Sequence, residues 1–223
     1  MKSSEWLRTI ESRWQARERR PRPRYGSLTD WARHVARGVI DPVARFLAGL
    51  GIHPNTITLL GFALSVGVGG LLAAGRLTLG GWLLLVVAPI DAFDGALARF
   101  TGKKSRFGAF LDSTLDRLSD VALLAGLLVH FLSAAATTEV LLCLFAIVGG
   151  LMVSYTRARS EALGIDCKVG LFTRLERMVV LIVGLIAGWP TMTLWVLAVG
   201  TNLTALQRIL HVYAASRDDP PVA

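Results

Sequence analysis

Long apolar runs separated by short polar links make up most of the chain after residue 53. The runs over 57–74 and 121–133 are nearly continuous, whereas the strands of a membrane barrel alternate between apolar and polar positions. Runs of this length are typical of helices that cross a bilayer. The pattern therefore predicts an all-α integral membrane protein with six transmembrane helices, at 56–74, 77–99, 108–132, 139–159, 173–188 and 191–211.

The composition excludes several other classes of protein. Hydrophobic residues make up 53% of the chain and charged residues 18%, so it is more apolar and less charged than most soluble domains. This hydrophobicity excludes a disordered chain. Because Cys143 and Cys167 are the only cysteines, a secreted disulfide scaffold and a four-cysteine zinc site are also excluded.

The formal net charge of +8 would suit a nucleic-acid binder, but the basic residues are placed as in a membrane protein. Eleven of the 24 Lys and Arg residues precede residue 50, and most of the others lie at 99–106, at 157–177 and near the C-terminus. The links after the first, third and fifth predicted spans contain one basic residue between them, Arg76. Because basic residues collect on the cytoplasmic side, both termini are predicted to be cytoplasmic. We expect a multi-pass protein of the cell membrane that contacts membrane lipids and binds no nucleic acid.

The sequence divides into four predicted parts. They are a basic cytoplasmic tail at 1–28, interfacial juxtamembrane helices at 29–52, the six-helix domain at 53–215 and a cytoplasmic C-terminal tail at 216–223. In the second part Trp31, Val35 and Val39 recur every four residues, which predicts an N-terminal amphipathic helix. A helix of this kind lies in the membrane interface.

Aspartates interrupt two of the apolar spans. Asp91 and Asp94 lie near the cytoplasmic end of the second span, and Asp112 and Asp116 lie near the start of the third. At 1.5 Å of rise per residue, Asp91 lies about 21 Å and Asp116 about 24 Å from the outer face. The spacings i,i+3 and i,i+4 place each pair on one helix face. Two helices are thus predicted to present carboxylates at matching depths.

Four carboxylates in a site of low dielectric constant would repel each other strongly. A divalent cation removes the repulsion, and oxygen-only ligands favour Mg²⁺, Mn²⁺ or Ca²⁺ over zinc. Two such ions can clamp phosphate oxygens during in-line displacement. The alternative is that these aspartates pair with Arg99, Arg106 and Arg117 and only join helices. Asp120, one turn deeper, is expected to pair with Arg117 or to form part of a polar cavity wall.

The aspartates belong to a longer pattern, D-x-x-D-G-x-x-A-R-x8-G-x3-D-x3-D, at 91–116. This pattern resembles, without departure in residue or spacing, the signature of the CDP-alcohol phosphatidyltransferase family. The segment P-N-x-x-T at 54–58 is similar to the motif at which the first span of that family begins. The predicted six spans are similar to the family's fold as well.

The resemblance implies a reaction and the residues that perform it. A CDP-linked lipid, CDP-diacylglycerol or CDP-archaeol, gives its phosphatidyl or archaetidyl group to an alcohol and releases CMP. Two metal ions, Mg²⁺ or Mn²⁺, are implied to bind Asp91, Asp94, Asp112 and Asp116, of which Asp116 is also the candidate catalytic base. The CDP-lipid site is implied to comprise Asn55, Thr58, Gly95, Ala98, Arg99 and Gly108. A homodimer is an expectation from the family alone.

Arginines near the fourth and fifth predicted spans are candidates for binding the acceptor: Arg157, Arg159, Arg174 and Arg177. They indicate an anionic acceptor such as a phosphorylated polyol, although positive-inside topology alone would also place arginines here. The patterns Y-x-R-A-R-x-E-x-x-G at 155–164 and G-L-x-x-R-x-E-R at 170–177 are similar to the phosphatidylinositol-phosphate and archaetidylinositol-phosphate synthase branch. The resemblance therefore implies inositol phosphate as the acceptor.

Two other functions stay open from the sequence. The first is the same chemistry with glycerol 3-phosphate or another polar alcohol as the acceptor. The second is a divalent-cation carrier or sensor, which would use the same carboxylates but would leave Gly95, Arg99 and Gly108 without a role. Metal-dependent release of CMP would separate the carrier from the transferases.

Overall fold

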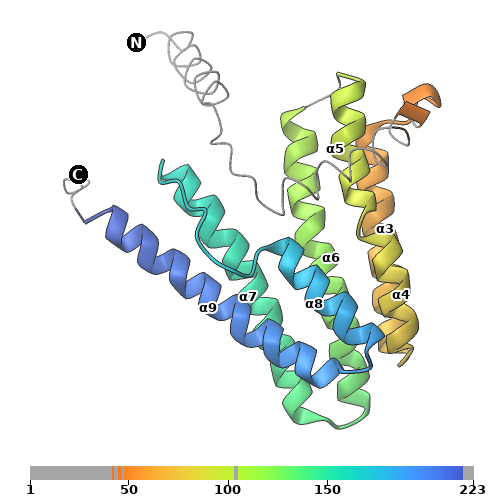
Figure 1. Ribbon diagram of the computed structural model, residues 1–223, viewed down its shortest axis with the longest axis vertical. Helices are drawn as coiled ribbons and strands as arrows, with labels where there is room; N and C mark the ends of the chain where they lie inside the picture. The colour runs from red at the N-terminus through yellow and green to blue at the C-terminus, as the bar shows by residue number, and fades with distance from the viewer. Residues whose placement is uncertain (1–41, 43–44, 47, 103–104, 218–223) are drawn as a thin grey trace. The chain divides into compact units, whose positions relative to one another are not determined.

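The computed structural model describes residue 42 and residues 45–46, 48–102 and 105–217. All of them belong to one compact unit, Ile40–Ala223. From Pro54 on they form seven helices and, within the described part, no strand, which confirms the all-α prediction (Figure 1). The helices are α3 Pro54–Ala73, α4 Leu77–Val87, α5 Ile90–Phe100, α6 Arg106–Ser133, α7 Thr137–Ala162, α8 Arg174–Ile186 and α9 Pro190–Ala215. The predicted tail at 1–28 and most of the predicted interfacial segment at 29–52 lie outside the described residues.

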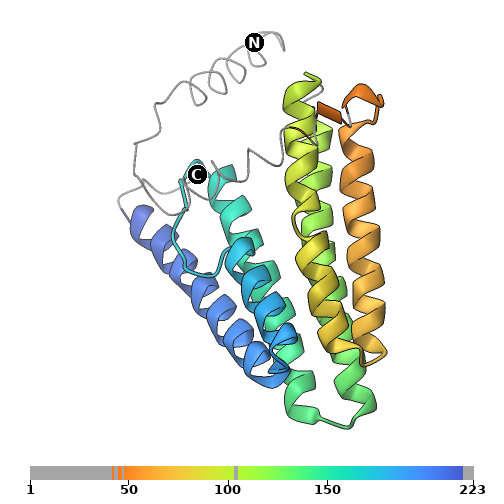
Figure 2. The ribbon, with the colours of Figure 1, turned by 45° about the vertical axis from the view of Figure 1, so that its right-hand side comes forward.

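The helices pack around a shared apolar core. α3 packs against α4, α5 and α6, whereas α7 packs against α6 and α9, and α8 lies between α4 and α9 (Figure 2). Buried leucines from most of these helices fill the interior, among them Leu72, Leu84, Leu123, Leu127 and Leu185. Each fully buried leucine stabilises the packed state by about 1.5–3 kcal/mol relative to an exposed one.

Glycines bring α3 and α6 into backbone contact. A Cβ atom added to Gly126 would lie 2.1 Å from the carbonyl oxygen of Gly69, and one added to Gly69 would lie 2.6 Å from the carbonyl oxygen of Ala122. No larger residue permits such an approach. At the other end of the pair, a Cβ atom on Gly108 would lie 3.1 Å from Asn55 Oδ1. α3 and α6 therefore run parallel and side by side along most of their length.

The predicted second span, 77–99, is divided between two helices and is not one continuous helix. α4 ends at Val87 and α5 begins at Ile90, so Ala88 and Pro89 separate two helices. Proline lacks an N–H donor, and its ring clashes with the carbonyl of the preceding turn, so a helix bends or breaks at this residue. The break lies directly before Asp91. The first aspartate pair is therefore carried by the short helix α5 and not by an uninterrupted membrane span.

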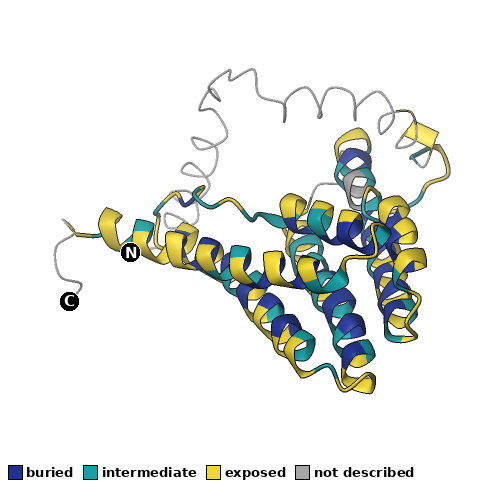
Figure 3. Cartoon of the chain, turned by 60° about the horizontal axis from the view of Figure 1, so that its bottom comes forward, coloured by how far each residue is buried: buried dark blue, intermediate teal, exposed yellow. Residues whose placement is uncertain are grey.

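Two of the described helices, α3 and α7, are long and apolar enough to cross a bilayer. By contrast, α8 has 13 residues and is about 20 Å long, shorter than a hydrocarbon core of about 30 Å. Exposed positions run along the outward faces of the helices (Figure 3). Many of the exposed residues are large and apolar, for example Trp82, Val86, Phe145 and Leu210. Such a surface is suited to contact with lipid. The count of six spans and the cytoplasmic position of both termini stay predictions.

Candidate active site

A pocket of about 260 Å³ lies where α3, α5 and α6 meet. Its lining residues are Pro54, Asn55, Thr58, Gly95, Ala98, Arg99, Ser105, Gly108, Ala109 and Asp112. All six residues that the sequence implied for CDP-lipid binding are among them. Sequence reasoning missed Pro54, Ser105 and Ala109, which adjoin those residues in the first turns of α3 and α6. Segments that are distant in the sequence thus form one site.

Helix caps place two walls of this pocket. His53 Nδ1 accepts a hydrogen bond from the Asn55 backbone N–H at 3.3 Å, and Pro54 occupies the first turn of α3. Ser105 Oγ accepts a hydrogen bond from the Gly108 backbone N–H at 2.9 Å and so begins α6. The two caps start both helices at the pocket, and this brings Asn55 beside Gly108.

The two glycines of the pocket differ in how much room surrounds them. A Cβ atom on Gly108 would lie 3.0 Å from Ser105 Oγ and 3.1 Å from Asn55 Oδ1, closer than ordinary contact. On Gly95 the nearest atom would be Arg99 Nη1, at 3.7 Å. At Gly108 an added methyl group would therefore press on two side chains of the pocket wall. A side chain at Gly95 would instead take up space that a ligand could use.

Positive groups line the pocket. The first turn of α6 contributes Ser105, Gly108 and Ala109. Backbone N–H groups without a helical partner give this turn the positive end of the helix dipole. Arg99 on α5 adds a full positive charge. A helix start next to an arginine is well suited to bind the phosphates of a nucleotide.

The aspartates predicted to bind metal lie on the two helices that flank this pocket. Asp112 lines it, and Asp116 lies one turn further along α6. Asp91 and Asp94 are residues of α5, but their side chains lie outside the described part of the structure. Among the described side chains, no three possible metal ligands are grouped together. The ligands that these positions offer are all carboxylate oxygens, which fit Mg²⁺ or Mn²⁺.

Two arginines of α8 pair with two aspartates of α6. Arg174 Nη1 lies 2.9 Å from Asp116 Oδ1, and Arg177 Nη2 lies 2.5 Å from Asp120 Oδ2. Arg174 Nε also lies 3.7 Å from Asp120 Oδ1. We call these four residues the α6–α8 ion-pair cluster. The structure therefore brings two of the predicted acceptor arginines beside the predicted base.

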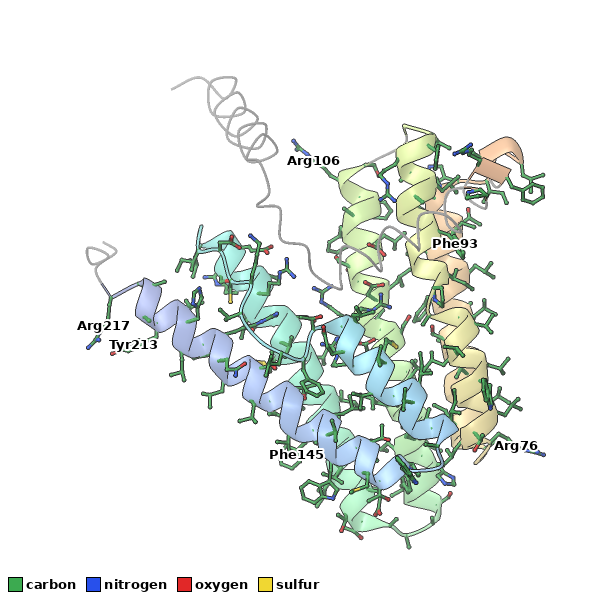
Figure 4. All side chains as sticks on the ribbon, viewed as in Figure 1. Arg76, Phe93, Arg106, Phe145, Tyr213 and Arg217 are labelled. Carbon is green, nitrogen blue, oxygen red and sulfur yellow. The ribbon has the colours of Figure 1, made fainter. Side chains whose placement is uncertain are left out.

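The predicted pairing of Asp120 with Arg117 is wrong. Arg117 donates instead to the carbonyl oxygen of Ser113, one turn earlier on α6. Asp120 is held by Arg177, which approaches from another helix. It does form part of a cavity wall, since Asp120 and Arg177 line a void of about 20 Å³. Arg106, at the start of α6, points away from the neighbouring helices (Figure 4).

The other two predicted acceptor arginines lie on an exposed part of α7. Arg157 Nε lies 3.0 Å from Glu161 Oε1 of the same helix, and both side chains are about half exposed. Arg159 is exposed as well. Ion pairs this exposed contribute little to stability. The structure thus gives Arg157 a partner on its own helix, whereas Arg174 and Arg177 join two helices.

Sequence reasoning also missed the residues that fix the start of α8. The Phe172 backbone N–H donates to Thr204 Oγ1 of α9 at 3.1 Å. Arg208, one turn further along α9, is buried and donates to the carbonyl oxygens of Val169, at 3.0 Å, and of Val153. An arginine within the last apolar run was the available signal, because buried charge in such a run is costly. These contacts tie α9 to α7 and to the segment that leads into α8.

The sequence pattern of the CDP-alcohol phosphatidyltransferase family matches residues 51–206. The chain belongs to the CDP-alcohol phosphatidyltransferase family. The match includes the pocket, the four aspartates and the α6–α8 ion-pair cluster. The predicted membership is confirmed, and the protein is an enzyme of phospholipid synthesis that transfers a phosphatidyl-type group from a CDP-linked lipid to an alcohol. This leaves the cation carrier or sensor without support.

Relatives come from the branch that the sequence indicated. The chain is 39% identical to the archaetidylinositol phosphate synthase of Methanothermobacter thermautotrophicus over 193 residues. The aligned region covers 84% of this chain and 95% of the relative. It is 36% identical to the phosphatidylinositol phosphate synthase of Streptomyces avermitilis over 211 residues. That aligned region covers 86% of this chain and 84% of the relative. The predicted similarity to this branch is therefore confirmed.

Solved structures agree with this placement. The Mycobacterium tuberculosis phosphatidylinositol phosphate synthase with CDP-DAG bound has a TM-score of 0.76 and 31% identity, over 83% of this chain and 98% of that chain. The same protein in complex with manganese and citrate has a TM-score of 0.77 and 31% identity, over 82% of this chain and 93% of that chain. Family membership and the two apolar helices support a location in a membrane. The homodimer stays a prediction.

Proposed function

We propose that the protein is a phosphatidylinositol-phosphate synthase. It transfers the phosphatidyl group of CDP-diacylglycerol, or the archaetidyl group of CDP-archaeol, to inositol phosphate and releases CMP. The observation that carries the proposal is that the donor pocket and a pair of arginines adjoin each other along α6. Asp112 lines the pocket for the CDP-lipid, and one turn away Asp116 contacts Arg174, which suits an anionic acceptor.

The donor half of the site holds the CDP group. Asn55, Thr58, Gly95, Ala98, Arg99 and Gly108 form its walls. The start of α6 and Arg99 attract the diphosphate. Asp91, Asp94 and Asp112, with Asp116 as a further ligand, would hold two Mg²⁺ or Mn²⁺ ions. When bound, these ions neutralise the diphosphate and make CMP a good leaving group.

The acceptor half of the site orients the attacking hydroxyl. Arg174 and Arg177 bind the acceptor phosphate through charge-assisted hydrogen bonds, and Arg157 and Arg159 add contacts from α7. Asp116 then lies beside the acceptor and takes the proton of its hydroxyl, since a general base must lie within hydrogen-bond reach of that proton. Because Arg174 contacts Asp116 directly, one arginine links acceptor binding to the base. The lipid tails stay in the bilayer while the reaction proceeds at the head group.

Purified protein in lipid nanodiscs tests the proposal. CMP release and the lipid product are measured with CDP-diacylglycerol or CDP-archaeol and with inositol 1-phosphate, free inositol or glycerol 3-phosphate. We expect inositol 1-phosphate to give the highest kcat/KM, and EDTA to abolish release until Mg²⁺ or Mn²⁺ is added. A preference for glycerol 3-phosphate or free inositol would overturn the proposed acceptor while leaving the transferase chemistry intact.

A further inference from the structure

Asp120 lies outside the eight-position pattern that identifies the family, yet its side chain is more buried than that of Asp116. Its side chain is 15% exposed, compared with 22% for Asp116. Asp120 Oδ2 accepts a hydrogen bond from Arg177 Nη2 at 2.5 Å, and its other oxygen faces Arg174 Nε at 3.7 Å. A carboxylate of this kind costs free energy to bury unless it is paired. Asp120 therefore has a defined task, and its two neighbours are the candidate acceptor arginines.

Arg177 is held on several sides by this arrangement. Its side chain is 10% exposed. Besides Asp120, it contacts the carbonyl oxygen of Phe172 through Nη1, at 3.4 Å. On the α7 side it lies next to Gly150, where an added Cβ atom would be 3.8 Å from Arg177 Nε, an ordinary contact distance. Among the described residues, Asp120 is the only oppositely charged partner found for Arg177.

The charges of the α6–α8 ion-pair cluster balance two against two. Asp120 neutralises Arg177 and shares Arg174 with Asp116. Without Asp120, Arg177 would lose the carboxylate that holds its Nη2, and Arg174 would lose the approach of its Nε to Asp120 Oδ1. Both guanidinium groups would then be less firmly oriented beside Asp116.

Asp120 belongs to the acceptor side of the protein and not to the donor pocket. The void that it lines with Arg177 shares no lining residue with the pocket of about 260 Å³. Asp120 therefore acts on the reaction through the two arginines and has no described contact with the walls of the CDP site.

We propose that Asp120 is a positioning residue that fixes Arg177 and orients Arg174, so that the acceptor phosphate is bound beside Asp116. This inference rests on the proposed function, because it takes the acceptor to be phosphorylated. It adds a residue to the acceptor half of the site that the family pattern does not contain.

Kinetics of Asp120→Asn in nanodiscs test the inference, with initial rates of CMP release measured against inositol 1-phosphate and against CDP-diacylglycerol. We expect the KM for inositol 1-phosphate to rise about ten-fold, as when a supporting ligand contact is lost, and the KM for the CDP-lipid to change less than about two-fold. Asp120→Glu keeps the charge and should recover part of the loss. The matched control is Glu139→Gln, which removes another half-buried carboxylate that accepts a hydrogen bond across helices, from Thr191 at 3.0 Å.

A double-mutant cycle separates positioning from a general structural role. If Asp120 acts through Arg177, then Asp120→Asn should add little to the acceptor KM in an Arg177→Gln background. Independent, multiplying effects would overturn the inference, as would an unchanged acceptor KM or equal losses for both substrates. If Asp120→Asn does not fold, two other variants test the effect on the acceptor KM. One is Asp120→Glu, which keeps the charge, and the other is the double variant Arg177→Gln/Asp120→Asn, which removes both charges. A wild-type enzyme that does not use inositol 1-phosphate would refute the proposed function itself, which is a distinct outcome from an active wild type with an unaffected variant.

Discussion

A Gly108→Ala substitution adds one methyl group where the wall of the pocket is tightest. The new Cβ atom would meet Ser105 Oγ at 3.0 Å and Asn55 Oδ1 at 3.1 Å, whereas ordinary contacts of a Cβ atom begin at 3.4 Å. Both side chains must therefore retreat by a few tenths of an ångström. Ser105 is displaced from the backbone N–H that it caps at 2.9 Å, and Asn55 is displaced from its place in the wall.

The expected effects on stability and on binding differ in size. Loss of a serine cap costs about 1 kcal/mol, and alanine in place of glycine within a helix gains about 0.5–1 kcal/mol. These two effects nearly cancel, so the free energy of unfolding should change by less than about 1 kcal/mol. Binding of the CDP-lipid has no such compensation. Misplacing the Asn55 amide costs about 0.5–1.5 kcal/mol, the value of one hydrogen bond, which corresponds to roughly two- to ten-fold in affinity.

Steady-state CMP release at varied CDP-lipid and at varied inositol 1-phosphate measures this effect, together with thermal unfolding. Gly108→Ala should raise the KM for the CDP-lipid and leave the KM for the acceptor nearly unchanged. The matched control is Gly67→Ala on α3, where a Cβ atom meets nothing within 4 Å and the residue is exposed. An unchanged KM for the CDP-lipid, or an equal rise in both KM values, would refute the assignment of this wall to the donor.

Four further substitutions test other parts of the site and the fold. Asp112→Asn should abolish CMP release while the protein stays folded, because it removes a charged metal ligand; near-wild-type turnover at saturating Mg²⁺ would contradict the metal assignment. Asp116→Asn should lose turnover but keep most of its CDP-lipid binding in a thermal-shift assay, and a complete loss of binding would show that its main role is in the metal site and not as the base. Arg177→Ala should raise the acceptor KM about ten- to a hundred-fold and affect phosphorylated acceptors far more than free inositol, so equal losses with both would argue against phosphate recognition. Gly126→Ala should lower the thermal midpoint, because its Cβ atom would lie 2.1 Å from the carbonyl oxygen of Gly69 and overpacking costs about 1–3 kcal/mol; an unchanged midpoint would argue against the close approach of α3 and α6.

The walls of the donor pocket could be predicted from the sequence because short-range features place them. Ser105 begins α6 by capping the N–H of Gly108, and His53 and Pro54 begin α3 in the same local manner. Once two helices start at the same level, the residues of their first turns are neighbours. The fixed spacing of the family pattern names residues that the structure places around the same pocket.

The break between α4 and α5 was missed although its cause is visible in the sequence. Pro89 stands inside an apolar run whose length alone suggests one continuous span. Hydrophobicity measures how well a segment suits a membrane, but it does not register the hydrogen bond that a proline removes. The consequence is local, since the break changes the path of the chain just before Asp91 and leaves the spacing of the two aspartates within α5 intact.

The acceptor half could be predicted only as a set of arginines because its geometry depends on contacts between distant segments. Arg177 reaches Asp120 across 57 positions, and the start of α8 is fixed by the bond between Phe172 and Thr204, across 32 positions. Helical periodicity offered Arg117 as the nearest partner for Asp120, and only the packing of α8 against α4 and α9 supplies a different one. A donor site encoded by local caps and a pattern of fixed spacing is tightly constrained in sequence. If Arg174 and Arg177 bind the acceptor as proposed, a site built from cross-helix ion pairs would change its ligand when a few side chains change, while the donor pocket stayed the same.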